Sequence, residues 1–303
     1  MFYRNACISD FHLRIIVYVT LIASKLQCNE SLILFMKHWQ AWIIGDWSWQ
    51  RILRLPLIAY GTIALYAYCF GDRQLFQPHP ASYRDTPDLV KLATPNGQTI
   101  SALYLTHVAA QYTILYSHGN AQDLGDIRPI LEDLRTLKFN ILAYDYRGYG
   151  TSQGKPSEAN AYQDIQTAYR FLTEQRGIKG DRIILLGQSI GSGPSVYLAT
   201  RKPIAGLIIQ SGFVSAFRIV VPFPLLPFDK FPNGDRLGQV HAPVLVVHGT
   251  GDQLIPFWQA KALYGAANQP KDLFPIQGAG HNDVNEVGGQ QYLKRIQTFA
   301  ESL

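Results

Sequence analysis

The sequence predicts an α/β protein, with a mainly parallel sheet covered by helices on both faces and an apolar N-terminal segment before it. Three observations support this prediction. From about residue 73 onward, short apolar strand patterns alternate with helical patterns, the order typical of parallel sheets. One strand pattern, Ile183–Leu186, continues directly into Gly-Gln-Ser-Ile-Gly and then into a helical pattern. Before residue 73, the run Leu55–Gly71 is apolar for about seventeen residues.

The composition indicates a folded chain with a sizeable core. Hydrophobic residues make up 47% of the 303 residues, and charged residues only 16%, well below the usual quarter. The net charge of +5 comes from scattered basic residues, which does not favour nucleic-acid binding. The three cysteines are Cys7, Cys28 and Cys69, so the sequence after them has no disulfide framework, cysteine metal site or cysteine nucleophile.

Residues 1–72 carry two apolar stretches, Ile15–Ala23 and Leu55–Gly71. The second is near the lower length limit for crossing a bilayer. The tryptophans between residues 39 and 49 precede it, and aromatic residues of this kind concentrate at membrane interfaces. We therefore expect a membrane anchor at 55–71, with a buried or signal-like helix as the alternative. A translation start at Met36 would leave this segment intact.

The charges beside this segment favour one orientation. Lys37, Arg51 and Arg54 precede it, and Arg73 follows it. Lys and Arg resist translocation, which would keep the N-terminal side in the cytoplasm. The domain from 73 to 303 would then face the periplasm or a lumen. The alternative is a helix lying in the membrane interface, with the domain in the cytoplasm.

The elements of the predicted domain follow one another closely. Residues 89–93 and 100–105 are predicted strands, joined by the turn Pro95-Asn96-Gly97. The other strand patterns are 113–117, 141–144, 183–186, 205–209, 244–247 and 274–276. The helical patterns are 125–137, 158–175, 194–199 and 289–302.

The strand, turn and helix around Ser189 predict a nucleophile at a sharp turn. Gly187 and Gly191 supply the small side chains that such a turn needs on both sides of the serine. The unpaired N–H groups and the positive dipole end of the helix favour negative charge on a substrate oxygen. The backbone N–H groups of Ile190 and of Asn120, in the loop after strand 113–117, are the expected oxyanion donors.

A serine nucleophile needs a histidine base oriented by a carboxylate. In this architecture the chain order is Ser, then Asp or Glu, then His, each after a strand. Asp252 follows the strand 244–247, and His281 lies in a glycine-rich loop after 274–276. The predicted triad is therefore Ser189, Asp252 and His281. Other acidic and histidine side chains fit the pattern less well; they are Asp229, Asp235, Asp272, Asp283 and His248.

The segment 213–231 is apolar and is interrupted by Pro222, Pro224 and Pro227, which prevent a long regular helix. It is either a lid or pocket wall for an apolar substrate, or a packed crossover to the next strand. The sequence has no metal-ligand spacing and no dinucleotide-binding glycine motif, so we expect neither a metal nor another cofactor.

Four stretches together resemble the α/β-hydrolase superfamily. They are Ser-His-Gly-Asn-Ala-Gln-Asp-Leu-Gly at 117–125, Tyr-Asp-Tyr-Arg-Gly-Tyr-Gly at 144–150, Gly-Gln-Ser-Ile-Gly at 187–191 and Gly-Ala-Gly-His-Asn-Asp at 278–283. Within that superfamily the chain looks most like the group of membrane-associated protein depalmitoylases and their bacterial relatives. The resemblance implies an α/β-hydrolase fold from about Phe76 onward and acyl ester or thioester substrates. The animal depalmitoylases carry a lipidated N-terminal cysteine cluster, which an apolar segment replaces here.

The sequence therefore predicts a membrane-anchored serine hydrolase that cleaves acyl esters or thioesters through an acyl-enzyme. Two alternatives remain. One is a serine peptidase that uses the same triad, and the other is a non-catalytic binding protein built on the hydrolase scaffold.

Overall fold

The computed structural model describes residue 38 and residues 49–303. Several features considered above lie outside the described residues: Cys7, Cys28, Met36 and the apolar stretch Ile15–Ala23. The chain divides into two compact units, residues 1–67 and residues 68–303.

Helix α3 (Trp49–Leu75) contains the predicted anchor. Its residues Ile52–Leu75 include an 18-residue window with a mean hydropathy of 1.4, which makes the helix long and apolar enough to cross a membrane. Apolar side chains along it, such as Leu53 and Leu57, are more than two-thirds exposed. Because exposed apolar surface on this scale is unfavourable in water, α3 is a candidate membrane anchor.

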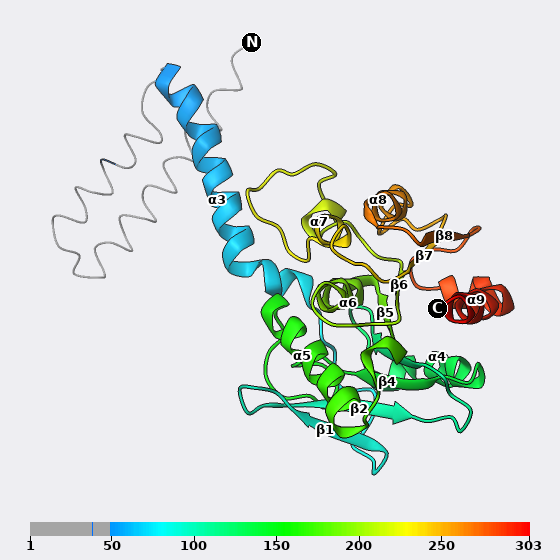
Figure 1. Cartoon of the computed structure of the whole chain (residues 1–303). Coiled ribbons are helices and arrows are strands. Elements are labelled where there is room, and N and C mark those ends of the chain that lie inside the picture. Colours follow the sequence, from blue (N-terminus) through cyan, green and yellow to red (C-terminus); the bar gives the residue numbers. More distant parts are fainter. Residues whose placement is uncertain (1–37, 39–48) are drawn as a thin grey trace. The chain divides into compact units, whose positions relative to one another are not determined.

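The larger unit is built on one eight-stranded sheet with the order β1-β2-β4-β3-β5-β6-β7-β8 (Figure 1). Strand β2 is antiparallel to both of its neighbours, and the pairs from β4 to β8 are all parallel. The strands are β1 (Leu89–Ala93), β2 (Thr99–Leu105), β3 (Thr113–Ser117), β4 (Asn140–Tyr144), β5 (Ile183–Gln188), β6 (Gly206–Gln210), β7 (Val244–Gly249) and β8 (Lys271–Ile276).

Every residue of β3, β5, β6 and β7 is buried. Their apolar runs lack polar alternation because helices cover the sheet on both faces. The helices are α4 (Leu124–Thr136), α5 (Glu158–Arg170), α6 (Ser192–Ala199), α7 (Asn233–Leu237), α8 (Trp258–Ala266) and α9 (Val284–Glu301).

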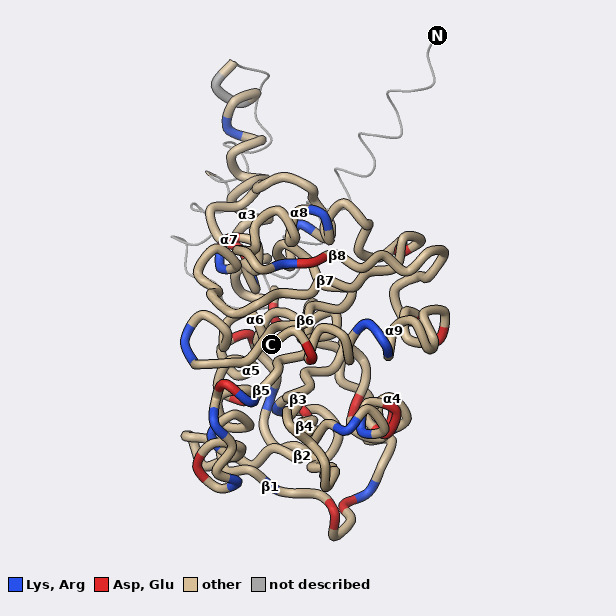
Figure 2. Tube along the Cα trace, turned by 45° about the vertical axis from the view of Figure 1, so that its right-hand side comes forward, with Lys and Arg blue, Asp and Glu red and all other residues tan. Residues whose placement is uncertain are grey.

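Two hydrophobic cores lie on opposite faces of the sheet. Helices α4 and α9 contribute Leu131 and Ile296 to one core. Helices α5, α6 and α8 contribute Ile165, Val196 and Leu263 to the other. Figure 2 shows α4 and α9 together on one side of the strands. The structure thus confirms the predicted α/β-hydrolase architecture, with a mainly parallel sheet and helices on both faces.

Three local features depart from the expected elements. Helices α7 and α8 are present where no helix was predicted. The last helix begins at Val284 rather than at 289, and Gly289 forms a kink inside it with a φ of 45°. The predicted helix 158–175 ends in a π-helical turn over Phe171–Gln175.

Candidate active site

Strand β5 leads straight into Ser189, which has a φ of 52° and is 8% exposed. A 3₁₀ turn over Ser189–Gly191 then continues into α6. A Cβ added at Gly191 would lie 2.0 Å from the carbonyl oxygen of Ser117, and one at Gly187 would lie 2.4 Å from that of Gly191. The two glycines therefore allow the close backbone approach that holds Ser189 in the left-handed region.

The loops after β5, β7 and β8 bring Ser189, Asp252 and His281 together. The Ser189 hydroxyl lies 2.9 Å from Nε2 of His281. On the other side of the ring, Nδ1 donates to Oδ2 of Asp252 over 2.7 Å. Since a carboxylate only accepts, Nδ1 carries a proton and Nε2 is left to accept from the serine. The arrangement can transfer a proton from the hydroxyl to the imidazole.

Asp252 has more partners than the sequence indicated. Its Oδ1 accepts from the backbone N–H groups of Leu254 and Ile255 at 2.9 and 2.7 Å. Its Oδ2 also lies 3.3 Å from Nε2 of His248, which donates to the carbonyl oxygen of Ile255. Burial raises the pKa of the Asp252 carboxyl, but hydrogen bonds from His248, His281 and Ile255 outweigh it and hold the pKa well below its usual range.

His248 thus contacts a member of the predicted triad, although it fits the triad pattern in the sequence less well than His281. Its spacing of four residues before Asp252 was the available signal. Asp283 has a related supporting position, since its Oδ1 accepts from the N–H of Gly280 at 2.6 Å. That bond fixes the turn immediately before His281.

The loop after β3 is held in place by the side chain of Asn120. Its amide nitrogen donates to the carbonyl oxygen of Leu75, and its oxygen accepts from the Gln77 N–H and the Tyr149 hydroxyl. These bonds fix the loop, and the backbone N–H of Asn120 is left as the expected donor to a substrate oxygen. The oxyanion donors Asn120 and Ile190 stay a prediction.

His118 precedes this loop and is completely buried. The Tyr146 hydroxyl donates to its carbonyl oxygen, and its ring packs against the Tyr146 ring. Its Nε2 lies 3.4 Å from the Asp145 carboxylate, which itself accepts from the N–H of Leu124. These contacts support a structural role for His118 in bracing the loop.

The proline-broken segment 213–231 connects β6 to α7. Asn233, just beyond it, donates to the hydroxyl of Ser192, and Ser192 donates to the carbonyl oxygen of Ser189. Asn233 also donates to the carbonyl oxygen of Phe213, so both ends of the segment are joined to the turn at Ser189. The middle of the segment is exposed to solvent: Val220 is 83% exposed and Phe223 57%.

His79, Asp123 and Asp126 form one cluster of potential metal ligands among the described residues. Asp123 accepts from the Ser82 N–H and caps the N-terminus of α4, while Asp126 accepts from the Asp123 N–H and lies 2.9 Å from His79 Nε2. These bonds give the cluster a structural role at the start of the helix.

Comparisons with known proteins agree with this architecture. A family described as serine aminopeptidase, S33 matches residues 109–226. The alpha/beta hydrolase domain-containing protein 17B of Homo sapiens is 40% identical over 220 residues, covering 71% of this chain and 76% of the relative. The 17C protein of Mus musculus is 42% identical over 194 residues, covering 63% of this chain and 60% of the relative.

Solved structures show the same fold at lower sequence identity. An esterase of Pyrococcus furiosus has a TM-score of 0.64 at 20% identity, covering 75% of this chain and 98% of that structure. A serine hydrolase homologue from Coxiella burnetii has a TM-score of 0.56 at 20% identity, covering 73% of this chain and 100% of that structure. By its fold and by the identity to the human relative, this chain belongs to the α/β-hydrolase superfamily, in the depalmitoylase-like group that includes the alpha/beta hydrolase domain-containing 17 proteins.

Proposed function

We propose that this chain is a serine hydrolase that cleaves acyl esters or thioesters with Ser189, His281 and Asp252 as its catalytic triad. The observation that carries the proposal is the continuous hydrogen-bonded path from Asp252 through His281 to Ser189. The path ends on a hydroxyl held at the start of a helix, where developing negative charge is favoured.

In the proposed mechanism, His281 accepts the proton of Ser189 as the serine oxygen attacks the carbonyl carbon. The Asn120 and Ile190 N–H groups receive the oxyanion. His281 then protonates the leaving alcohol or thiol, and an acyl-enzyme remains. Water that is deprotonated by His281 releases the acid and regenerates Ser189. Because the pKa of Asp252 is held low, its carboxylate stays ionised and stabilises the imidazolium in both halves of the cycle.

The segment 213–231 supports an apolar acyl group as part of the substrate. It carries large apolar side chains, and its C-terminal end packs against the helix that follows the nucleophile. Phe231 is fully buried there, in edge contact with Tyr162 and Phe76. We assign the segment as a wall for acyl carbons, which lose contact with water when they bind.

A peptidase that uses the same triad is the second candidate. The description of the matching family as a serine aminopeptidase favours it. Amide and ester cleavage share the same acyl-enzyme chemistry, so only the relative rates on the two substrate classes separate the candidates.

The test has two parts. A fluorophosphonate probe should label the full-length chain and fail to label Ser189→Ala; equal labelling of both would leave the non-catalytic scaffold as the explanation. A panel of p-nitrophenyl acyl esters, run beside aminoacyl p-nitroanilides, should then show faster turnover of the esters. Preferential cleavage of the anilides would favour the peptidase.

Helix α3 could anchor the enzyme in a membrane. Residues 52–70 would span about 28 Å as a helix, close to the thickness of a hydrocarbon core of about 30 Å. Lys37, Arg51 and Arg54 precede the apolar stretch of this helix. From these basic residues, we propose that its N-terminal side stays in the cytoplasm and that the hydrolase domain faces the periplasm or a lumen. Protease added outside spheroplasts would degrade an exported domain and spare a cytoplasmic one.

A further inference from the structure

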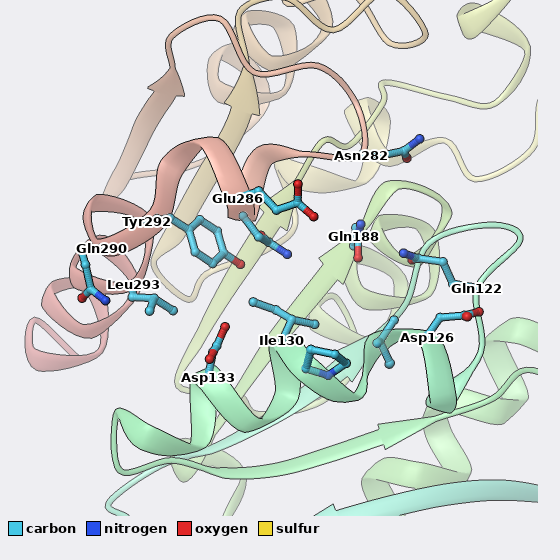
Figure 3. Close-up of a pocket in the computed structure, with 14 residues that line it drawn as sticks. Gln122, Asp126, Ile130, Asp133, Gln188, Asn282, Glu286, Gln290, Tyr292 and Leu293 are labelled. Carbon is cyan, nitrogen blue, oxygen red and sulfur yellow. The ribbon is translucent and has the colours of Figure 1, made fainter. Parts of the chain in front are cut away.

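A groove of about 530 Å³ lies between α4 and α9 (Figure 3). Gln188, Asn282 and Gln122 line one side of it. Gln188 directly precedes Ser189 and Asn282 directly follows His281, so this side borders the triad. The other side extends past Glu286 toward Asp133. The volume is typical of a ligand site.

The groove carries negative charge in a chain whose net charge is +5. Asp126, Asp133 and Glu286 contribute to its lining, which includes no Lys, Arg or His. Asp126 is paired with His79 at 2.9 Å. Asp133 and Glu286 have no ion-pair partner within residues 49–303, which the structure describes. Two carboxylates are therefore available to a cationic ligand.

The polar groups of the groove match a polypeptide backbone. The amide oxygen of Gln188 accepts from the Tyr116 hydroxyl, and that of Gln122 accepts from the Gly119 N–H. Each side chain therefore keeps its N–H groups for carbonyl oxygens of a ligand. The side-chain oxygen of Asn285, which also lines the groove, is buried without a hydrogen-bond partner. A peptide N–H could satisfy that acceptor.

The groove and the apolar segment 213–231 approach Ser189 from opposite faces of the sheet. Helices α4 and α9 belong to one core, whereas Phe213 and Phe231 of the segment belong to the other. The two substituents of a scissile carbonyl also diverge from the reacting carbon. An acyl chain against 213–231 would therefore direct the leaving group toward the groove.

We propose that the groove binds the leaving group of an acylated polypeptide and prefers Lys or Arg near the acylated residue. This inference rests on the proposed function. Asp126 lies beside Gln122, on the side of the groove that borders the triad (Figure 3). From there to Asp133 the rise along α4 is about 10 Å, the span of about three extended residues. The preferred cationic side chains therefore lie within three or four residues of the acylated one.

The experiment compares three S-octanoyl-cysteine peptides that differ only in two flanking residues, both Lys, both Gln or both Glu. The p-nitrophenyl ester of octanoic acid serves as the small substrate, and the full-length chain is assayed in a neutral detergent. We expect kcat/KM to fall in the order Lys, Gln, Glu, with Lys above Gln by about five- to tenfold, as two partly exposed ion pairs would give. The preference should shrink in 0.5 M salt because salt screens such pairs.

The double variant Asp133→Asn, Glu286→Gln should reduce the Lys-to-Gln ratio to near one. The matched control is Glu174→Gln, Asp181→Asn, which removes two exposed carboxylates near the amino end of β5, the end opposite Ser189. The control should keep the wild-type ratio.

Equal rates on the three peptides, with normal cleavage of the small ester, would overturn the groove assignment and leave the hydrolase assignment intact. If the wild type cleaved neither the three peptides nor the small ester, the proposed function would be overturned, and this inference with it. If the groove variant does not fold, the order of the peptides and its salt dependence in the wild type still decide.

Discussion

The substitution Asp252→Asn tests the triad most directly because it changes a proton position and keeps the shape of the side chain. Oδ1 of Asp252 accepts two backbone N–H groups, from Leu254 and Ile255. The carbonyl oxygen of an asparagine would be held at that position. Its NH₂ group would then replace Oδ2, the atom 2.7 Å from Nδ1 of His281.

An NH₂ group at that position can only donate, so Nδ1 of His281 would have to accept. The ring proton would move to Nε2, which faces the Ser189 hydroxyl at 2.9 Å. A protonated Nε2 cannot take the serine proton. We therefore expect kcat to fall by about 10⁴, which corresponds to a barrier about 5.5 kcal/mol higher.

The fold should survive this change because the turn keeps its acceptor. The new NH₂ would also face Nε2 of His248, a second donor, and we expect the unfolding midpoint to fall by about 2–4 °C. The assay is the turnover of p-nitrophenyl butyrate, with thermal unfolding followed by circular dichroism. The matched control, Asp283→Asn, keeps the acceptor for the Gly280 N–H and should retain activity near that of the wild type. Turnover of Asp252→Asn within about tenfold of the wild type would refute the proposed role of Asp252.

Four further predictions follow from the site and the two units. Ser189→Ala and His281→Ala should each reduce kcat/KM by roughly 10⁵ to 10⁶, and the double variant should be no worse; near-normal turnover of either would refute the triad. If 213–231 binds acyl carbons, each added methylene from acetyl to hexanoyl should contribute ~0.8 kcal/mol, or about fourfold in kcat/KM, and a flat series would remove that role. Because Asp252 has a lower pKa in the folded than in the unfolded chain, its ionised form stabilises the fold above about pH 4, and this contribution is lost as the pH falls further; Asp252→Asn should therefore show a shallower loss of unfolding free energy in acid titrations. Deleting residues 1–67 should give a soluble, active domain, whereas recovery of the full-length chain from the soluble fraction in low salt without detergent would contradict the anchor.

The sequence alone was sufficient for the features that local sterics decide. Fully buried parallel strands need continuous apolar runs, and β3, β5 and β7 have them. A serine with positive φ between two close backbone segments needs flanking glycines, and Gly187 and Gly191 in the sequence therefore predict the turn at Ser189. The apolar stretch within α3 was visible for the same reason, because its composition is a local property of the chain.

The tertiary structure decided the contacts between segments far apart in the sequence. Ser189 and His281 are 92 residues apart, and only the packing of β5, β7 and β8 in one sheet brings their loops together. The contact of His248 with Asp252 depends on how the loop after β7 folds back. The hydrophobic pattern of the sequence does not predict that conformation. The kink at Gly289 requires a backbone conformation that the glycine permits and does not impose. The acidic groove combines side chains from α4 and α9, whose proximity follows from their packing on the same face of the sheet. Local sequence preferences act over a few residues, whereas a site depends on which elements pack together, and burial of the whole apolar surface determines that.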